Sequence, residues 1–347
     1  MQLLRAFVLA LGVASLPAFA QENDAAPPVP LPRPAVTFPP QKIAYPGGVS
    51  AQFDIAYETP ADLHPLTLDI YTPKPSPTPL PFVVFVHGGG WDSGDSRHAL
   101  AFADLPRALA GLAAQGYVVA SVNYRLSQEA HFPAALQDVK AAIRWLRGHA
   151  ADYGGDSTRL AAWGMSAGGQ LAAMAGAACG VARFEPDGKI DYTAPSDCVE
   201  AVIDWFGPTD LSPSGANKNR PAPTPEGRYL GCEPAACAPG IVRLASPLAF
   251  ISENTPPFLI QQGEADTAVA PAQSQALYDA LKKRGVPAEL VLYPGVGHGF
   301  QKDGKPDADT VTQAMDKIAG FLAATFPKPR VKSPPRRGDA KPRVSRR

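Results

Sequence analysis

The residue with the clearest chemical signature is Ser166, which lies in the pentapeptide Gly-Met-Ser-Ala-Gly at positions 164–168. The apolar residues 160–163 predict a short buried strand and the small residues 169–176 predict a helix, so Ser166 falls on the sharp turn between them. A glycine two positions before the serine and another two positions after it allow a strained backbone and close approach of neighbouring chain. This pattern is typical of a nucleophilic serine; a structural serine in a glycine-rich turn is the alternative.

A second glycine-rich turn, His-Gly-Gly-Gly-Trp at positions 87–91, directly follows the apolar residues 82–86. Acyl transfer passes through a tetrahedral intermediate whose oxyanion needs hydrogen-bond donors, and backbone amides of consecutive glycines can approach it without a side-chain clash. A phosphate-binding turn is the alternative, but no Gly-Lys-Ser/Thr sequence follows. The sequence therefore predicts an oxyanion hole formed by the amides of four residues, namely Gly88, Gly89, Gly90 and Ala167.

A serine nucleophile needs a general base and a group that orients that base. Among the six histidines, His298 stands out because it follows an apolar stretch at 290–293 and lies in a glycine-rich loop that can reach Ser166. His87, which opens the second glycine turn, is better explained as a residue that holds that turn in shape. We therefore expect His298 to be the base.

The acid that orients the base should lie between Ser166 and His298, where the chain has fourteen acidic residues. Asp266 is the best placed, because it comes just after a predicted strand and is separated from His298 by one helix and one strand. This spacing puts the two residues on successive loops at the same edge of a sheet, in the chain order Ser, Asp, His. Glu264 is the near rival for this role, and Asp210 is a more distant one.

From residue 51 onward, predicted strands and helices mostly alternate. The predicted strands cover residues 51–57, 66–71, 82–86, 117–123, 160–163, 200–206, 258–261 and 290–293. The predicted helices cover residues 106–115, 133–150, 169–176, 272–283 and 307–325. Repeated strand-then-helix units with apolar strands indicate an α/β fold, with a mostly parallel sheet covered by helices on both faces. Right-handed crossovers place the carboxyl ends of such strands at one edge, where we expect the site.

Residues 208–247 interrupt this alternation with Pro, Gly, Asn and two cysteines. The segment is too long for an ordinary connection, so we expect a small insertion beside the site. Four aromatic residues at predicted strand ends or in the neighbouring loops could line a substrate pocket, with core packing as the alternative. They are Trp91, Trp205, Phe206 and Phe300.

These motifs resemble the α/β-hydrolase esterases, in particular the branch related to hormone-sensitive lipase and to bacterial feruloyl and acetyl-xylan esterases. The resemblance covers roughly residues 49–326 and includes three further stretches. These are Val-Asn-Tyr-Arg-Leu at 122–126, the Phe-Pro pair at 132–133 and Ser-Pro-Leu at 246–248. The resemblance implies an α/β-hydrolase fold with an eight-stranded, mostly parallel sheet and a Ser-His-Asp site.

The first 20 residues have the pattern of a signal peptide, with Arg5, an apolar stretch at 6–16 and a small-x-small ending at Ala20. We expect cleavage there and export to the periplasm or the medium. The apolar stretch is too short to remain as a membrane-spanning helix, so we do not expect an integral membrane protein. After a Pro-rich linker at 21–48, the 347-residue chain is expected to form one catalytic domain over 49–327.

Residues 328–347 carry nine Lys or Arg and one acidic residue, are rich in Pro and lack large apolar side chains. We expect this basic segment to be disordered, because it cannot bury enough apolar surface to form a core. A solvated tail without a partner and a weak contact with an anionic envelope surface are both open. No nucleic-acid partner is expected.

The four cysteines suit disulfides in an exported protein, and three connectivities are open. Cys179 and Cys198 flank elements at the edge opposite the site, whereas Cys232 and Cys237 lie on the site side. Pairing 179 with 198 and 232 with 237 therefore avoids crossing the sheet. Metal binding is disfavoured, because the one close cysteine pair has neither a second pair nor a matching His cluster.

Hydrolysis of carboxylic esters is the leading hypothesis, with a small-molecule or polysaccharide-linked ester as substrate and no cofactor. The same residues could cleave an amide, as in formamidases or peptidases, although export argues against a formamidase. A non-catalytic binding protein on a hydrolase fold is the alternative of another class. The presence of all three triad members and of the glycine turn argues against that alternative.

Overall fold

The computed structural model describes residues 42–60, 64–185, 194–213 and 221–327. The predicted signal peptide, the linker up to residue 41 and the basic tail at 328–347 lie outside the described residues. Within the described residues, no helix combines the length and the apolar character that a membrane crossing requires.

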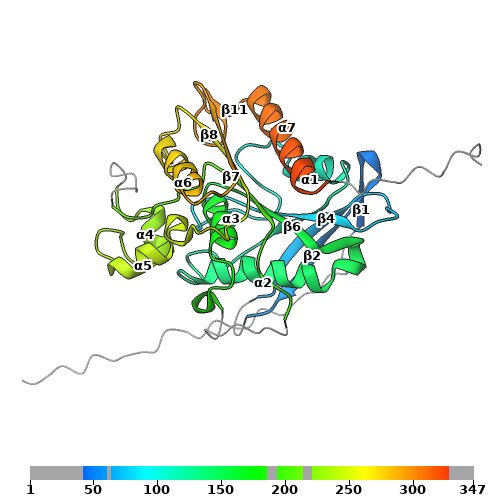
Figure 1. The fold of residues 1–347 in the computed structure, drawn as a ribbon, viewed down its shortest axis with the longest axis horizontal. Helices are drawn as coiled ribbons and strands as arrows, with labels where there is room; N and C mark the ends of the chain where they lie inside the picture. The colour runs from blue at the N-terminus through cyan, green and yellow to red at the C-terminus, as the bar shows by residue number, and fades with distance from the viewer. Residues whose placement is uncertain (1–41, 61–63, 186–193, 214–220, 328–347) are drawn as a thin grey trace, which may run out of the picture. The chain divides into compact units, whose positions relative to one another are not determined.

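The fold is organised around one sheet with the strand order β1-β2-β3-β5-β4-β6-β7-β8-β9 (Figure 1). Its strands are β1 (Lys42–Tyr45), β2 (Val49–Glu58), β3 (Leu66–Thr72), β4 (Leu80–Val86), β5 (Val118–Val122), β6 (Gly155–Met165), β7 (Ala201–Trp205), β8 (Phe258–Gly263) and β9 (Ala288–Tyr293). A separate two-stranded sheet pairs β10 (Gln301–Lys302) with β11 (Lys305–Pro306). The strands from β4 to β9 pair in parallel, and β1, β2 and β3 extend the sheet in antiparallel pairs. The expected α/β fold with a mostly parallel sheet is confirmed.

The sheet has nine strands in the described part of the chain, not eight, because β1 adds a strand that the sequence analysis assigned to the linker. β1 pairs antiparallel with β2 after a tight turn at Pro46–Gly48. The ring of Tyr45 packs edge-on against that of Tyr71, 5.9 Å away. The Pro and Gly residues that suggested a linker form the turn, so the described fold begins at Lys42 and not near residue 49.

Helices cover both faces of the sheet, because successive strand side chains point to opposite faces and both sets are apolar. In β4, for example, Val84 packs in one core cluster and Phe85 in the other. The first face carries α2 (Ala134–Gly148), α3 (Ala167–Ala177) and α6 (Pro271–Lys283). The second carries α1 (Leu105–Ala113) and α7 (Ala308–Thr325), which lie side by side in Figure 1.

The predicted insertion at 208–247 contains two short helices, α4 (Pro225–Leu230) and α5 (Pro239–Leu244). The disulfide between Cys232 and Cys237 lies between them, and the other disulfide joins Cys179 to Cys198. These are the pairs favoured by the chain topology. One bridge therefore connects the end of α3 to the segment before β7, and the other lies within the insertion.

Candidate functional site

Ser166 is the residue at which β6 turns into α3, and its backbone is strained. Its φ and ψ angles are 55° and −121°, a combination that side chains with a Cβ rarely adopt. A Cβ on Gly164 would overlap the carbonyl oxygen of Gly168, and one on Gly168 would overlap that of Val86. Both glycines are therefore required by close backbone approach, which lets the turn present the serine side chain at the carboxyl edge of the sheet.

The tertiary structure brings Ser166, His298 and Asp266 into one hydrogen-bonded chain. His298 Nε2 lies 2.9 Å from Ser166 Oγ, and His298 Nδ1 lies 2.7 Å from Asp266 Oδ2. The Asp266 side chain is fully buried, whereas that of His298 is 19% exposed. Because the carboxylate accepts the proton on Nδ1, the neutral imidazole leaves Nε2 free to accept the serine proton.

Both carboxylate oxygens of Asp266 accept hydrogen bonds. Its Oδ1 accepts hydrogen bonds from the amides of Ala268 and Val269, at 2.8 and 2.9 Å. Its Oδ2 accepts a hydrogen bond from Gln262 Nε2 at 2.9 Å, in addition to that from His298. This set of donors fixes the direction in which the carboxylate faces the histidine.

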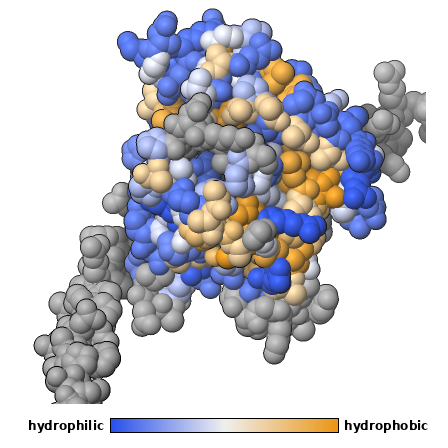
Figure 2. All heavy atoms as spheres, turned by 90° about the vertical axis from the view of Figure 1, so that its left-hand side faces the viewer, coloured by the Kyte–Doolittle hydropathy of each residue, from blue (hydrophilic) through white to orange (hydrophobic). Residues whose placement is uncertain are grey.

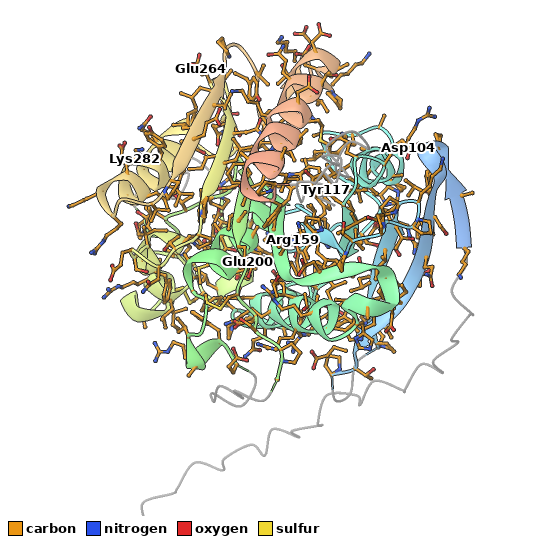
Figure 3. All side chains as sticks on the ribbon, turned by 45° about the vertical axis from the view of Figure 1, so that its right-hand side comes forward. Asp104, Tyr117, Arg159, Glu200, Glu264 and Lys282 are labelled. Carbon is orange, nitrogen blue, oxygen red and sulfur yellow. A yellow bond between two sulfur atoms is a disulfide. The ribbon has the colours of Figure 1, made fainter. Side chains whose placement is uncertain are left out.

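The two rival acids of the sequence analysis face elsewhere. Glu264 is exposed directly after β8, and Figure 3 shows it at the upper rim of the molecule. Asp210 accepts hydrogen bonds from the amide and hydroxyl of Ser212, both at 2.9 Å. Of the three acids considered from the sequence, only Asp266 contacts His298.

The glycine turn and the start of α3 carry backbone amides without a protein acceptor in the described part of the chain. Among the described residues, no hydrogen bond joins the amides of Gly89, Gly90 or Ala167 to a protein acceptor. Ala167 is the first residue of α3, where a helix leaves its amides without an internal partner. A Cβ on Gly88 would lie only 3.2 Å from that of Ser166, so the glycine turn packs directly against the serine turn.

His87 stabilises the glycine turn through a hydrogen bond to Gly88, whereas the hydrogen bond with Ser166 Oγ is formed by His298. Burial lowers the pKa of His87 to about 4, which keeps the imidazole neutral near pH 7. Its Nδ1–H donates to the carbonyl of Gly88 at 2.8 Å, and its ring stacks on that of Tyr124. The Tyr124 hydroxyl in turn donates to the His87 carbonyl at 3.0 Å.

The four aromatic residues suggested as pocket walls are between 0% and 2% exposed, and the packing role describes them better. Phe206 lies edge-on to the His298 ring at 4.9 Å, and Phe300 packs against both Phe206 and Trp205. Trp91 stacks on Tyr229 at 4.5 Å. Phe206 therefore packs beside His298, and Trp91 packs between the glycine turn and Tyr229.

Helix α4 lies in the insertion at 208–247 that was expected beside the site, but its contacts with the glycine turn were not predicted from the sequence. Tyr229 stacks on Trp91, and Arg228 forms an ion pair with Asp92, with Nε and Oδ2 3.0 Å apart. Pro225 lies against Gly90, at 3.1 Å from where a Cβ would stand. These contacts depend on how the insertion folds back over the glycine turn, and no local pattern in the sequence signals them.

A cavity of about 510 Å³ lies in the insertion and the segment that follows β7. Its mostly apolar wall also carries charged side chains, and includes Asp210, Pro234, Val242, Arg243 and Leu248. Figure 2 shows the side of the molecule that carries α4, α5 and α6, where apolar residues gather among hydrophilic ones. No group of three or more His, Cys, Asp or Glu in the described ranges is arranged to hold a metal ion.

Comparisons with known proteins identify the family and the fold of the chain. The BD-FAE family model matches residues 68–281. Esterase LipC of Mycobacterium tuberculosis is 34% identical over 238 residues, which are 67% of this chain and 56% of LipC. This chain thus spans little more than half the length of the first curated relatives it matches.

Two solved structures share the fold. One is a truncated carbohydrate esterase from gut microbiota, with a TM-score of 0.67 and 30% identity over 79% of this chain and 95% of that one. The other is a thermophilic esterase from Thermogutta terrifontis, with a TM-score of 0.63 and 29% identity over 81% of this chain and 93% of that one. The α/β-hydrolase fold is therefore shared over most of the described residues.

Proposed function

This chain belongs to the BD-FAE family, and on that premise we propose that it hydrolyses carboxylic esters through Ser166, His298 and Asp266. The observation that carries the proposal is the hydrogen-bonded chain from Asp266 through His298 to Ser166 Oγ. Within the described ranges, the neighbouring amides of Gly90 and Ala167 also lack a protein acceptor. The esterases among the relatives and structural neighbours support the same reaction.

In the first half of the reaction, Ser166 Oγ attacks the ester carbonyl carbon while its proton passes to His298 Nε2. The carbonyl oxygen becomes an oxyanion, which accepts hydrogen bonds from the amides of Ala167 and of the glycine turn. The intermediate collapses as the bond to the alcohol oxygen breaks, and the imidazolium returns the proton to that oxygen. Asp266 stabilises the imidazolium and keeps its Nδ1 proton in place.

In the second half, water attacks the acyl-enzyme with His298 as the base, and the acid leaves as Ser166 regains its proton. The same steps would cleave an amide, which is the alternative bond. We propose a small-molecule or carbohydrate-linked ester as substrate, because a carbohydrate esterase is among the structural neighbours.

We also propose that the protein is exported. The two disulfides support this location, because such bonds persist in oxidising compartments. The signal-like first 20 residues support it as well. Cell fractionation of the full-length protein should find it outside the cytoplasm, and a purely cytoplasmic, uncleaved protein would contradict export.

The function is tested with Ser166→Ala, which should reduce turnover of short p-nitrophenyl esters by about 10⁴-fold or more. A fluorophosphonate probe should label the native protein and leave the variant unlabelled. Ser157→Ala is a matched control, because Ser157 is exposed on the same strand at the opposite end. Retained turnover in a folded Ser166→Ala protein would overturn the assignment, and faster cleavage of matched anilides would favour an amide hydrolase.

A further inference from the structure

Residues 204–207, which form the end of β7 and the turn after it, contact both the serine and the histidine of the site. We call this segment the 204–207 turn. The carbonyl of Trp205 accepts the backbone N–H of Ser166 at 2.8 Å. The ring of Phe206 lies edge-on to that of His298, with 4.9 Å between centroids and 66° between planes. A shift of this turn would therefore move the serine backbone and the support of the imidazole ring together.

The turn has a strained backbone that its own hydrogen bonds hold in place. Phe206 has a φ of 46°, which is unfavourable for a residue with a bulky side chain. Its amide donates to the carbonyl of Gln261 on the neighbouring strand β8, at 2.9 Å. The carboxylate Oδ1 of Asp204 accepts the amide of Gly207 at 2.9 Å and so closes the turn. Asp204 is the only side chain among the described residues that forms a hydrogen bond within this turn.

The same carboxyl group is wedged against the first turn of α3. A Cβ on Gly169 would overlap Asp204 Oδ1, and one on Gly207 would stand 2.7 Å from the amide nitrogen of Gln170. The first turn of α3 also contains Ala167, whose amide is a candidate oxyanion donor. Asp204 thus lies between the turn that supports His298 and the helix that begins at the serine.

Burial of a carboxyl group at this position lowers the stability of the folded protein. Asp204 is fully buried, and among the described residues its Oδ2 has no hydrogen-bond partner. Burial raises its pKa to about 7. A leucine would avoid the cost of burying an unpaired polar oxygen, but it could not accept the hydrogen bond from Gly207.

We propose that Asp204 is a positioning residue, which aligns Ser166 with His298 by closing the 204–207 turn through its hydrogen bond with Gly207. The inference rests on the proposed function, since it concerns the geometry of the same nucleophile and base. Its effect is expected on the chemical step and not on substrate binding, because Asp204 is fully buried and acts through its hydrogen bond with Gly207. Displacing reacting groups by about 1 Å can cost roughly 10²-fold in rate.

The test compares two substitutions of similar size. Asp204→Asn keeps an oxygen that can accept the Gly207 amide, and should keep kcat for p-nitrophenyl acetate within about twofold. Asp204→Leu removes the acceptor, and should lower kcat about 10²-fold with little change in KM. The rate of fluorophosphonate labelling should fall in the Leu variant as well, because it reports the nucleophilicity of Ser166.

Ile203→Ala on the same strand is the matched control for loss of stability alone. Ile203 is fully buried in the core of the opposite face, so its truncation should lower the melting temperature but leave kcat near the native value below that temperature. Circular dichroism checks folding of each variant. If Asp204→Leu does not fold, Asp204→Ala replaces it, and if neither folds, the Asn variant alone decides.

A folded Leu or Ala variant with native kcat would overturn the proposal, as would an Asn variant that loses kcat more than tenfold at an unchanged melting temperature. These outcomes can be distinguished from failure of the proposed function. If the proposed function were wrong, the native protein itself would neither turn over esters nor react with the fluorophosphonate at Ser166.

Discussion

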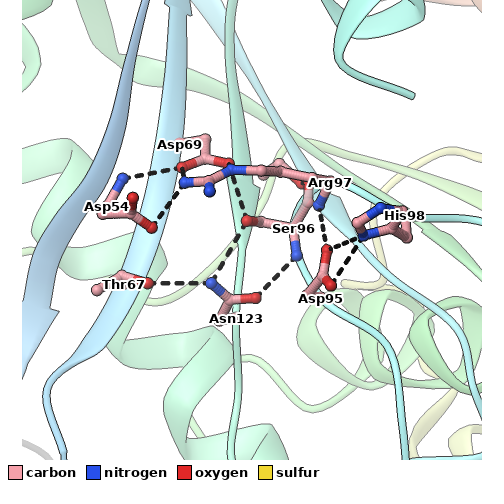
Figure 4. A network of polar contacts seen from close by, with 9 residues as sticks. Asp54, Thr67, Asp69, Asp95, Ser96, Arg97, His98 and Asn123 are labelled. Atoms are coloured by element: carbon pink, nitrogen blue, oxygen red, sulfur yellow. Dashed lines mark hydrogen bonds and ion pairs between the residues drawn. The ribbon is translucent and has the colours of Figure 1, made fainter. Parts of the chain in front are cut away.

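The antiparallel end of the sheet and its parallel carboxyl edge use buried polar groups in opposite ways. At the antiparallel end, Asp69 is fully buried and accepts hydrogen bonds from Arg97 Nε and Nη2, from Ser96 Oγ and from the amide of Asp54 (Figure 4). Asn123 joins Ser96 to β3 through Thr67 in the same cluster. This network attaches the loop that follows the glycine turn to strands β2, β3 and β5.

At the carboxyl edge, several polar groups have no hydrogen-bond partner in the described part of the protein. Among the described residues, the amides of Gly90 and Ala167 have no protein acceptor, and Asp204 Oδ2 has no partner. Ser166 Oγ is bonded to the histidine and lies on a strained backbone. In the antiparallel network, polar groups satisfy one another and stabilise the frame, whereas the amides of Gly90 and Ala167 keep a hydrogen-bonding capacity that we propose a substrate oxygen uses.

The largest effect should come from Asp266→Asn, which tests the carboxyl edge directly. An amide NH₂ facing His298 Nδ1 would favour the wrong imidazole tautomer, so kcat should fall by about 10⁴-fold. Steady-state kinetics with a p-nitrophenyl ester measures the loss. Glu264→Gln is the control, because Glu264 is exposed and should be neutral. Near-native activity of Asp266→Asn would remove Asp266 from the proposed mechanism.

The pH dependence of stability should reveal the unusual state of Asp204. Burial raises its native pKa to about 7, whereas the pKa in the unfolded chain is about 3.9. Between these values the native state binds a proton that the unfolded state does not, so the free energy of unfolding falls as pH rises. The total loss is at most about 4 kcal/mol.

Asp204→Asn removes this titration, so its stability relative to the native protein should increase from about pH 4 to about pH 8. Urea denaturation at several pH values measures the difference. Ile203→Ala contains Asp204 and should keep the native pH dependence. A constant difference between the Asn variant and the native protein across this range would show that Asp204 does not titrate as expected.

Replacing a member of the antiparallel network should affect stability and not catalysis. Arg97→Met leaves the buried Asp69 carboxylate without its ion pair, and should lower the free energy of unfolding by about 3 kcal/mol. Arg159→Met breaks a pair with Asp156, whose carboxylate is more exposed than that of Asp69, and should cost less than about 1 kcal/mol. Both variants should keep kcat near the native value. A tenfold loss of kcat in stable Arg97→Met would contradict the division between the two regions.

The two disulfides offer a smaller test of the same division. Loop closure predicts about 3 kcal/mol for the Cys179–Cys198 bridge and about 2 kcal/mol for the Cys232–Cys237 bridge, with separations of 19 and 5 residues. Replacing Cys232 and Cys237 by Ser should nevertheless alter ester kinetics more, because Tyr229 of the adjoining α4 stacks beside the glycine turn. Urea denaturation measures the loss of stability, and KM measures the effect on substrate binding. An equal change in KM when Cys179 and Cys198 are replaced by Ser would contradict the expectation.

Much of the fold could be predicted because its signals are local. The strand and helix that flank Ser166 were expected at 160–163 and 169–176, and the structure has β6 and α3 there with longer bounds. The strand at Lys42–Tyr45 was missed because its residues form a strand only by pairing with β2. Sequence position suggested that aromatic residues such as Trp205 line a pocket, but it does not reveal burial. In the structure these rings are buried and pack in the core.

The sequence alone determined the elements and the motifs. Apolar periodicity predicts most strands and helices to within a few residues of their observed bounds. The crossover rule then places the loops that carry Ser166, Asp266 and His298 at the same edge of the sheet. Only the tertiary structure decided which acid faces His298, how α4 covers the glycine turn, and that Asp204 is buried with an unpaired oxygen. These facts depend on contacts between residues far apart in the chain, where packing and desolvation, not local propensity, set the outcome.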